Sequence, residues 1–379
     1  MRKSEGAAFS RSEGAKRNML LQSLHRRGQA SRVALARALN ISNSRVCDLV
    51  EQMVGEGLLL EQGVEGDRRG RRGVSVRLNP DYGQLVGFDM EAKRLRMVAT
   101  NFAGDVIWQN RHPLSAPKDR DSVIDEILAF ITAGMADVRK QFGKPLAFGI
   151  AASGVIDAKR GTILHYDLLP HMVDVPLREL IAREVELPCL MDNNIRAMTL
   201  AEWVSGAAKG LSTFMCVAVR SGVGCGLVLN GRLRGGSHGF GGEMGYMLAP
   251  AGSNSGNGAW KTLQQLVSES ALGVDVEADG FAGISDSAAK RCGELIGTTL
   301  ASVAAIIDPE AFVLAGGLMN PMGPLWPHVF ETFRRYALTE LIERVHLLPA
   351  RLGLFAAAQG VAYRALYEQL FPVMVAVSP

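Results

Sequence analysis

Four arginines stand close together in the segment EGDRRGRRG, residues 65–73, where glycines interrupt the basic run. Guanidinium groups bind phosphate and enter a narrow minor groove of DNA, where the potential is strongly negative. Apolar runs on both sides, at residues 58–63 and 74–78, predict two strands. We therefore interpret this segment as the tip of a basic wing. Its predicted DNA contacts are Arg68, Arg69, Arg71 and Arg72.

Three helical patterns precede the wing. The first has apolar residues at helical spacing from Arg17 and ends at Gly28. Ser31 is a predicted N-cap of the second helix, which runs to Asn40, and Ser42 is a predicted N-cap of the third. The short turn between the last two gives helix-turn-helix dimensions, so the third helix would reach base edges in a major groove. The predicted DNA contacts of these helices are Ser31, Arg32, Ser42, Asn43, Ser44 and Arg45.

The charge is divided unevenly along the 379 residues, whose net charge is +3. Residues 1–79 hold 15 Lys and Arg against 8 Asp and Glu, which gives +7, whereas the rest of the chain holds 26 against 30, which gives −4. Positive charge concentrated on a small domain is typical of proteins that bind a polyanion, because neutralised phosphates release counterions. A solvated basic tail without a partner is the alternative.

The length and composition indicate two or three globular domains, since 47% of the residues are hydrophobic and 21% are charged. Disordered and collagen-like chains are excluded. The five cysteines lie far apart without a CxxC pair, which argues against a disulfide framework and a thiolate metal site. The polar start lacks the apolar segment of a signal peptide, and no run of about 18 apolar residues follows. We expect a cytoplasmic protein that does not enter a membrane.

In the rest of the chain, predicted strands end repeatedly at glycine or polar clusters. Asp89 lies near a turn between two apolar runs, and residues 148–157 and 311–319 are apolar runs that lead into glycines. The segment SGVGCG, residues 221–226, is the predicted tip of a hairpin. In open α/β sheets such strand ends line a ligand cleft. The sequence therefore predicts an α/β domain with a cleft.

Taken in order, these segments resemble the ROK family (repressors, open reading frames, sugar kinases) along essentially the whole chain. The resemblance is carried by the winged-helix pattern SRVALARALNISNSRVCDLVEQMVGEGLL, the junction GRRGVSVRLNPDYGQLVGFDM and the segments GVIDAKRGTI, SGVGCGLVLNGRLRGGSHGFGGEMGYM and LAGGLM. It implies an α/β fold with an N-terminal winged helix-turn-helix at residues 1–79. A two-lobed, actin-like (ribonuclease H-like) domain would follow at residues 80–379. The resemblance is to repressors of the N-acetylglucosamine and xylose type.

One departure from the family concerns catalysis. In family kinases an Asn-Asp pair precedes a helix that ends in LAE, and the Asp takes a proton from the sugar hydroxyl. Counted back from Glu202, Asn193 takes the Asn position and Asn194 the Asp position. A carboxamide forms hydrogen bonds but cannot accept that proton, and Asp192 would lie too far along its strand. We expect no catalytic residue and no kinase activity.

Two more departures concern zinc and nucleotide. The zinc-binding His of the family corresponds to Tyr246, and Ser255, Asn257 and Thr262 stand in place of cysteines. These groups are poor zinc ligands, so we predict no metal. The loop would then be held by packing, with Tyr246 and Trp260 as the replacements, or it would be mobile. After Asp89 the sequence MEAKRL replaces the glycine-rich phosphate turn of the kinases, so we expect neither ATP nor another cofactor.

The remaining polar positions of the family's sugar site are suited to binding hydroxyl groups. The predicted effector contacts are Asn193, Asn194, Glu243, Tyr246 and Gln264, the last in place of a family Glu. The resemblance thus implies a regulator, a repressor of carbohydrate uptake or catabolism genes, with double-stranded operator DNA and a sugar or sugar derivative as partners. The alternatives are an active sugar kinase with an accessory DNA-binding domain, and an effector-independent DNA-binding dimer.

We expect a homodimer or a dimer of dimers, because paired half-sites multiply affinity. The apolar C-terminal segments at residues 332–345 and 355–371 are the candidate contact surfaces, and a place in the core would explain them equally well.

Overall fold

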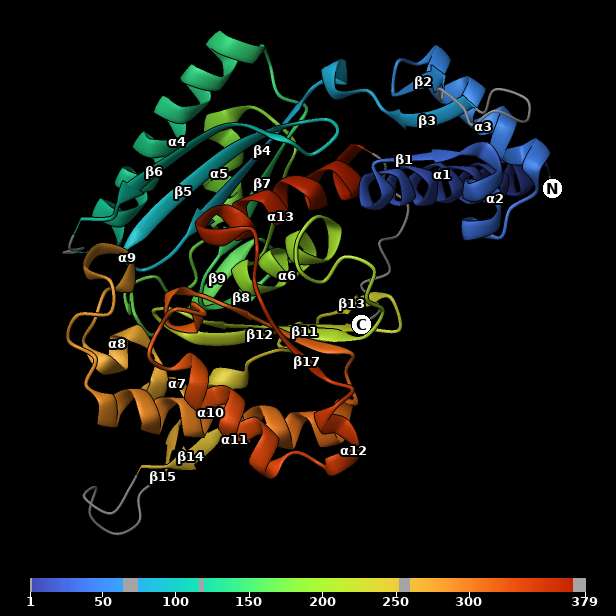
Figure 1. Ribbon diagram of the computed structural model, residues 1–379. Coiled ribbons are helices and arrows are strands. Elements are labelled where there is room, and N and C mark those ends of the chain that lie inside the picture. Colours follow the sequence, from blue (N-terminus) through green and yellow to red (C-terminus); the bar gives the residue numbers. More distant parts are fainter. Residues whose placement is uncertain (1, 64–73, 116–118, 252–259, 371–379) are drawn as a thin grey trace.

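The structure is a computed structural model that describes residues 2–63, 74–115, 119–251 and 260–370, with side chains from residue 14 to residue 368 of these ranges. Its N-terminal part combines three helices with an antiparallel sheet of strand order β1-β3-β2 (Figure 1). Its elements are α1 (Arg2–Arg27), β1 (Gln29–Ser31), α2 (Arg32–Leu39), α3 (Asn43–Gly55), β2 (Leu59–Gly63) and β3 (Val74–Leu78).

Local sequence explains the helix-turn-helix. Ser31 Oγ accepts a hydrogen bond from Ala34 N at 3.2 Å, and Ser42 Oγ accepts one from Arg45 N at 3.4 Å, so both predicted N-caps are confirmed. Asn40 ends α2 in the left-handed region, with φ 53°, and turns the chain toward α3.

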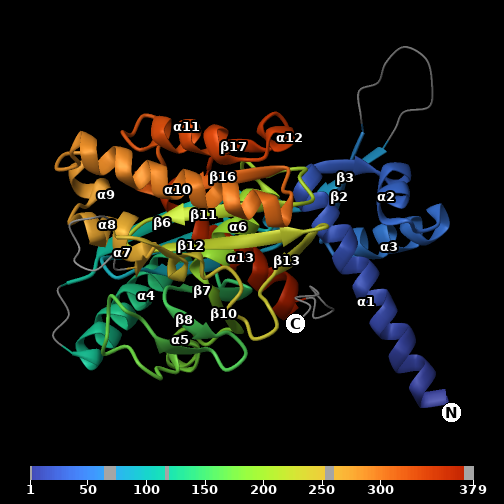
Figure 2. The same ribbon diagram turned by 90° about the horizontal axis from the view of Figure 1, so that it is seen from below.

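The first helix is longer than predicted, because it begins at Arg2 rather than near Arg17. Residues 2–16 are rich in Arg, Lys, Glu and Ala, which favour a helix without giving an apolar stripe. Periodicity therefore gave no signal for this part, which projects from the rest of the molecule (Figure 2).

Two five-stranded sheets form the larger part of the molecule and share one topology. Their strand orders are β10-β7-β4-β5-β6 and β13-β12-β11-β16-β17. In each, three consecutive strands form an antiparallel meander and two later strands add in parallel. The first sheet contains β4 (Gln84–Met90), β5 (Arg94–Asn101), β6 (Val106–Pro113), β7 (Ala147–Ala152) and β10 (Cys189–Asn193). The second contains β11 (Phe214–Val219), β12 (Val223–Leu229), β13 (Arg232–Arg234), β16 (Ala311–Ala315) and β17 (His346–Pro349).

Helices cover both sheets and fill the space between them (Figure 1). The outer helices are α4 (Arg120–Phe142) and α5 (Leu177–Val185) on the first sheet, and α10 (Asp286–Ile307) and α11 (Trp326–Tyr336) on the second. Between the sheets lie α6 (Asn194–Val204) and α13 (Ala356–Ala365). We call the first sheet with its outer helices the first lobe, and the second sheet with its outer helices the second lobe. The expected α/β fold class is confirmed.

Helix α13 decides between the two explanations that the sequence left open for residues 355–371. Its residues are almost all buried between the sheets, so residues 356–365 belong to the core and cannot form a dimer surface. Gly87 and Gly149 explain the close fit, since a Cβ on either would lie within 2.3 Å of an α13 carbonyl oxygen. Of the other candidate segment, Phe333 is buried whereas Tyr336 and Leu338 are exposed.

One apolar core connects the N-terminal part to the first lobe. It contains Leu20 and Leu24 of α1, Leu85 of β4, and Ala362 and Leu366 at the end of α13. The described residues of the N-terminal part are therefore packed against the first lobe. No helix among the described residues is long and apolar enough to span a membrane.

Candidate functional site

A cavity of about 550 Å³ opens between the two lobes. It lies where β10 gives way to α6, opposite the hairpin β11–β12 and the short helices η2 (Met244–Tyr246) and α7 (Gln264–Val267). All five predicted effector contacts line this cavity: Asn193, Asn194, Glu243, Tyr246 and Gln264. The structure thus brings together side chains that lie up to 71 residues apart, from Asn193 to Gln264.

The side chains of Asn193 and Asn194 form different hydrogen bonds at the start of α6. Asn193 Oδ1 accepts hydrogen bonds from Ile195 N at 2.9 Å and Arg196 N at 3.2 Å, so its side chain is the N-cap of the helix. Asn194 is buried, and its Nδ2 donates to Ser153 Oγ at 2.7 Å. In this orientation of the amide, the Asn194 oxygen is the acceptor left for a ligand.

Asp192, which precedes this pair on β10, is held by two guanidinium groups. Its carboxylate is fully buried and accepts a hydrogen bond from Arg196 Nε at 2.8 Å. Its other oxygen forms an ion pair with Arg364 of α13. A carboxylate held by two guanidinium groups is a poor proton acceptor, because both stabilise its charged form.

Glu243 supplies a carboxylate to the cavity wall. Burial raises its pKa above the ordinary value, and the nearby Arg196 guanidinium opposes that rise. The chain reaches this position through Gly242, whose φ is +103° and whose Cβ would lie 1.9 Å from the Cys225 carbonyl oxygen. Only glycine fits there, so the backbone at Gly242 fixes where Glu243 enters the cavity.

Sequence reasoning missed Asp167, which joins the two lobes at the cavity. Its Oδ2 accepts hydrogen bonds from Tyr246 Oη at 2.9 Å and from Gln264 Nε2 at 3.1 Å. Asp167 follows β9 (Thr162–His165) on the first-lobe side, whereas its two donors belong to the second lobe. Burial and the Asp167 carboxylate raise the pKa of Tyr246 to about 12, so the phenol stays protonated as a donor.

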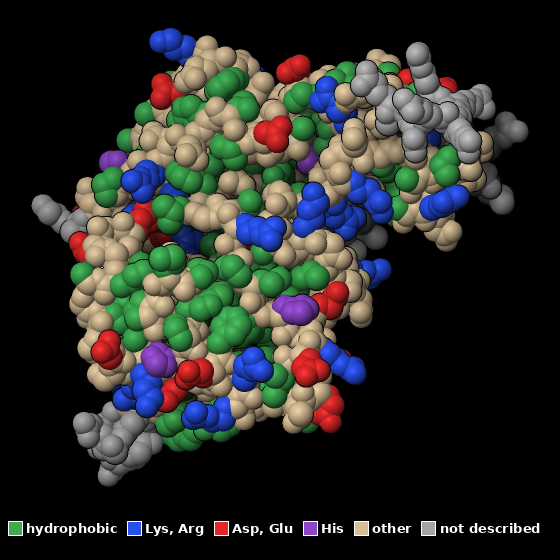
Figure 3. All heavy atoms as spheres, in the orientation of Figure 1, with side chains coloured by type: hydrophobic (Ala, Val, Ile, Leu, Met, Phe, Trp, Pro, Cys, Tyr) green, Lys and Arg blue, Asp and Glu red, His purple; other side chains and the backbone are tan. Residues whose placement is uncertain are grey.

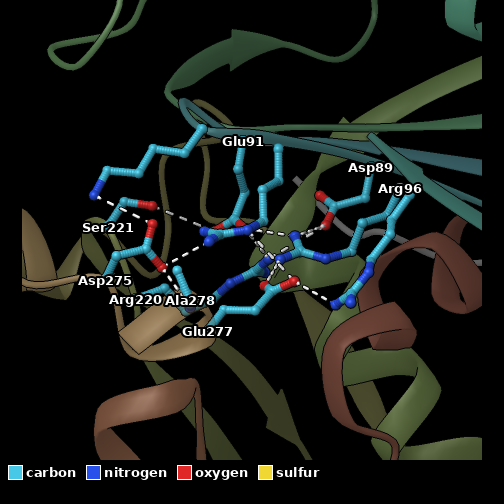
Figure 4. A network of polar contacts seen from close by, with 11 residues as sticks. Asp89, Glu91, Arg96, Arg220, Ser221, Asp275, Glu277 and Ala278 are labelled. Carbon is cyan, nitrogen blue, oxygen red and sulfur yellow. Dashed lines mark hydrogen bonds and ion pairs between the residues drawn. The ribbon is translucent and has the colours of Figure 1, made fainter. Parts of the chain in front are cut away.

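A network of ion pairs occupies the other end of the cleft, where β4 turns into β5 (Figure 4). Arg220 of the second lobe contacts Glu91 at 2.5 Å and Asp89 at 3.3 Å, both on the first-lobe side. Arg96 contacts Glu91 at 2.5 Å and also pairs with Glu277 of the second lobe. We call these five residues the ion-pair network.

More charged side chains extend this network across the cleft. Arg94 binds Asp275 at 2.6 Å, and Arg111 binds Glu277 at 3.0 Å. Asp275 itself caps α9 (Val276–Asp279) through a hydrogen bond from Ala278 N at 3.1 Å. Basic and acidic side chains are visible inside the hollow between the lobes in the space-filling view (Figure 3).

The ion-pair network separates the cavity from a second one of about 420 Å³. Glu91 and Arg220 line both cavities, and Gly316 and Gly317 line only the second. Burial raises the pKa of Asp89, whereas Arg220 and Arg96 overcome the effect of burial on Glu91 and lower its pKa. Side chains that neutralise one another thus fill the turn after Asp89, where kinases of the family carry glycines.

The helix-turn-helix places most of its predicted DNA contacts at the surface. Ser42, Asn43 and Ser44 are exposed at the start of α3, while Arg45 is half-buried and lies 3.9 Å from Asp48. Ser31 is exposed, and Arg32 forms an ion pair with Glu61 of β2, which DNA would have to displace. The wing arginines Arg68, Arg69, Arg71 and Arg72 lie outside the described residues.

A family model described as "ROK family" matches residues 85–368. The chain belongs to the ROK family. The xylose repressor of Caldicellulosiruptor bescii is 27% identical over 218 residues, which are 57% of this chain and 54% of that protein. The chain thus spans about half the length of this ROK relative. The xylose repressor of Bacillus subtilis is 25% identical over 91% of this chain and 93% of its own.

A solved ROK structure extends the likeness to the whole fold. It is a ROK family transcriptional regulator described as a homolog of the Escherichia coli MLC protein. It covers 95% of this chain and 98% of its own, with a TM-score of 0.77 and 20% sequence identity. The likeness shows the same arrangement of an N-terminal helix-turn-helix part and a ROK domain.

In the zinc region of the ROK domain, the loop at residues 252–259 lies outside the described residues, so how it is held stays a prediction. Trp260 lies on the strand β15 (Trp260–Thr262) with 64% of its surface exposed. Tyr246 is also half-exposed, and its hydroxyl binds Asp167. Ser255 and Asn257 lie outside the described residues. Elsewhere in the chain, the described side chains include no cluster of three or more His, Cys, Asp and Glu placed to hold a metal ion.

Proposed function

We propose that this ROK protein is a sugar-responsive transcriptional repressor. Its helix-turn-helix binds double-stranded operator DNA, and its cavity binds a sugar or sugar derivative without phosphorylating it. The observation that carries this proposal is the contrast within one cleft. Five hydrogen-bonding side chains face a cavity large enough for a sugar, whereas the base position holds Asn194 and ion pairs fill the phosphate turn.

The chemistry of the two positions supports a non-enzymatic role. Loss of a positioned general base costs about 10²- to 10⁴-fold in rate. Phosphate would also have to displace Glu91 and Asp89 from Arg220, and these carboxylates would repel it. A chain that binds a sugar but lacks both the base and the phosphate turn is suited to sensing.

The relatives support the choice of ligand class. Two ROK relatives are named xylose repressors, so D-xylose is the first sugar to test, followed by D-glucose and N-acetyl-D-glucosamine. We propose carbohydrate uptake or catabolism genes as the targets. The DNA-binding domain comprises residues 1–79 and the effector domain residues 80–379, and the protein acts as a homodimer or a dimer of dimers.

Thermal unfolding and calorimetry with these three sugars test the effector site. A ligand that binds only the native state raises the free energy of unfolding, by about 2.7 kcal/mol at a ligand concentration of 100 times its Kd, and so raises the Tm. Glu243→Gln should weaken the response, whereas Glu294→Gln on the exposed face of α10 should leave it unchanged. Sugar-dependent release of ADP from ATP at an ordinary rate would establish the kinase alternative. A chain that ignores all sugars but binds DNA would be the effector-independent dimer.

Selection of duplexes from a random pool tests the DNA-binding surface. Arg71→Ala with Arg72→Ala should weaken binding to all sequences and flatten its dependence on salt, because fewer counterions are released. Asn43→Ala or Arg45→Ala should change the selected sequence instead. Equal losses from both sets on every duplex would contradict this division.

A further inference from the structure

Helix α6 runs from the cavity to the DNA-binding part of the molecule. Its N-cap Asn193 and its first residue Asn194 lie in the cavity wall. Its last turn holds Trp203, and the Arg26 guanidinium of α1 lies over that ring, 5.5 Å from the centroid. An 11-residue helix is about 16 Å long, so one rigid element connects both places.

Helix α13 packs against the backbone of α6, and an ion pair ties it to the strand that precedes α6. Gly360 lies against α6 so closely that a Cβ would be 1.8 Å from the Ala197 carbonyl oxygen. The buried ion pair between Asp192 and Arg364 ties the strand that precedes α6 to the last turn of α13. Relative sliding of the two helices would break this contact, which is costly for buried charges.

Arg196 connects this ion pair to the loop of the second lobe that lines the cavity. Arg196 Nη2 lies 2.6 Å from Asp192 Oδ1, and its Nη1 donates to the Gly239 carbonyl at 2.7 Å. Gly239 belongs to the loop that leads to Glu243. A shift of Glu243 or Asn194 around a ligand would therefore act on Asp192, although Asp192 does not line the cavity.

The helical turn η5 (Leu366–Leu370), which directly follows α13, contacts α1 one turn beyond Arg364. The Tyr367 hydroxyl contacts His25 Nδ1, and Asn18 Nδ2 donates to the Tyr367 carbonyl at 3.3 Å. The ring of Tyr363 lies 5.8 Å from that of His25. Burial lowers the pKa of His25 to about 4, so the ring is neutral and no charge has to be moved when this contact shifts. The C-terminal ends of both α6 and α13 thus lie against α1, the helix that precedes the helix-turn-helix.

We propose that α6 and α13 move as one body that transmits the state of the cavity to α1, with the Asp192–Arg364 pair as the positioning contact. The proposal rests on the proposed function, because it says how a sugar in this cavity changes DNA binding. A ligand shifts such a body only by its differential affinity for two placements. Breaking the pair should therefore uncouple the two sites while leaving each able to bind.

Hydrogen exchange of the full-length chain measures the coupling without any ligand. Asp192→Asn lies far from α1 in sequence, yet it should speed amide exchange in residues 18–27 by about tenfold. Arg364→Met should do the same, whereas Arg364→Lys, which keeps the charge, should restore much of the protection. Glu368→Gln is the matched control, because Glu368 binds the same Arg364 at 2.6 Å without touching Asp192. Peptides of α10, on the outer face of the second lobe, report general destabilisation.

Exchange with D-xylose, D-glucose and N-acetyl-D-glucosamine as probes adds the ligand. In the natural chain, the sugar that raises the Tm should also change exchange in residues 18–27. In Arg364→Met the same sugar should still raise the Tm, but the change in residues 18–27 should vanish, and selected DNA should bind equally with and without it.

The outcomes separate this coupling from the proposed function. If no sugar raises the Tm, the proposed effector site fails, and the ligand-free exchange still decides whether the helices are coupled. Equal acceleration in α10 and residues 18–27, or none in residues 18–27 from Asp192→Asn and Arg364→Met, overturns the coupling. An Arg364→Met chain whose DNA affinity responds to the sugar as the natural chain does would also overturn it.

Discussion

The two ends of the cleft between the lobes differ in the partners of their carboxylates. At the cavity end, the Glu243 side chain makes no hydrogen bond or ion pair with the described residues. At the other end, Asp89 and Glu91 are matched by Arg96 and Arg220 at 2.5 to 3.6 Å. Polar groups left without partners are free to bind a ligand, whereas groups that satisfy one another hold the lobes together. At the ion-pair end the charged groups thus hold the lobes together. At the cavity end, neutral donors on Tyr246 and Gln264 hold Asp167 across the cleft, and the Glu243 carboxylate is left for recognition.

Removal of Arg220 should produce the largest loss of stability. Arg220→Met leaves Asp89, which is fully buried, and Glu91 with less compensation, so we expect a loss of about 3–5 kcal/mol in the free energy of unfolding. Glu243→Gln at the cavity end should change it by less than about 1 kcal/mol. Urea denaturation of both variants measures the contrast. Adding Glu91→Gln to Arg220→Met should recover part of the loss.

Equal losses from the two variants would contradict the proposed difference between the two ends of the cleft. Similar losses from Arg220→Met and Glu243→Gln would mean that both ends contribute cohesion. Arg183→Met is the matched control, since it breaks the exposed pair with Glu179 on α5 and should have no measurable effect.

A pH dependence should distinguish the ion-pair end from the rest. Burial, with the nearby Glu91 and Asp275 charges, raises the pKa of Glu269 to about 7, and Glu269 lines the second cavity. Between its unfolded value near 4.5 and 7, the folded state binds more protons than the unfolded state. The Glu269 contribution is therefore full at low pH and is lost as pH rises through 7. Glu269→Gln should reduce the decrease in unfolding free energy over this pH range by on the order of 2 kcal/mol.

Unfolding free energies at pH 5 and pH 8 test the slope. The control is Glu294→Gln, at an exposed position on α10, which should keep the slope of the natural chain. An unchanged slope in Glu269→Gln would show that the Glu269 carboxylate is not held among like charges.

The cavity residues were predicted because the resemblance to the ROK family assigns each of them to a family position, such as Asn194, eight residues before Glu202. The N-caps Ser31 and Ser42 needed no resemblance, because capping is local. The ion pair between Arg96 and Glu277 joins residues 181 positions apart, and no periodicity marks it. Asp167 was missed likewise, because it lies in a loop and its role depends on how the lobes meet.

A smaller effect is expected from the hydrogen bond between Tyr246 and Asp167. Tyr246→Phe removes one hydroxyl that binds across the cleft at 2.9 Å, while Gln264 still holds Asp167. We expect a loss of about 1 kcal/mol in unfolding free energy and a few-fold weaker sugar binding, because the cavity wall is less well fixed. A double-mutant cycle with Asp167→Ala isolates the pair, because Ala has no group that can accept the hydrogen bond of Tyr246. A coupling energy of zero would mean that this contact does not join the lobes.

The smallest effect is expected from restoring a carboxylate at the base position. Asn194→Asp supplies the group that family kinases carry there, yet sugar-dependent ADP release should stay at background, because the ion-pair network still fills the phosphate turn. The matched variant Asn194→Leu has a similar shape and cannot accept a proton. ADP release by Asn194→Asp and not by Asn194→Leu would show that the network opens for nucleotide. The residue at position 194, and not the ion-pair network, would then account for the lack of phosphorylation.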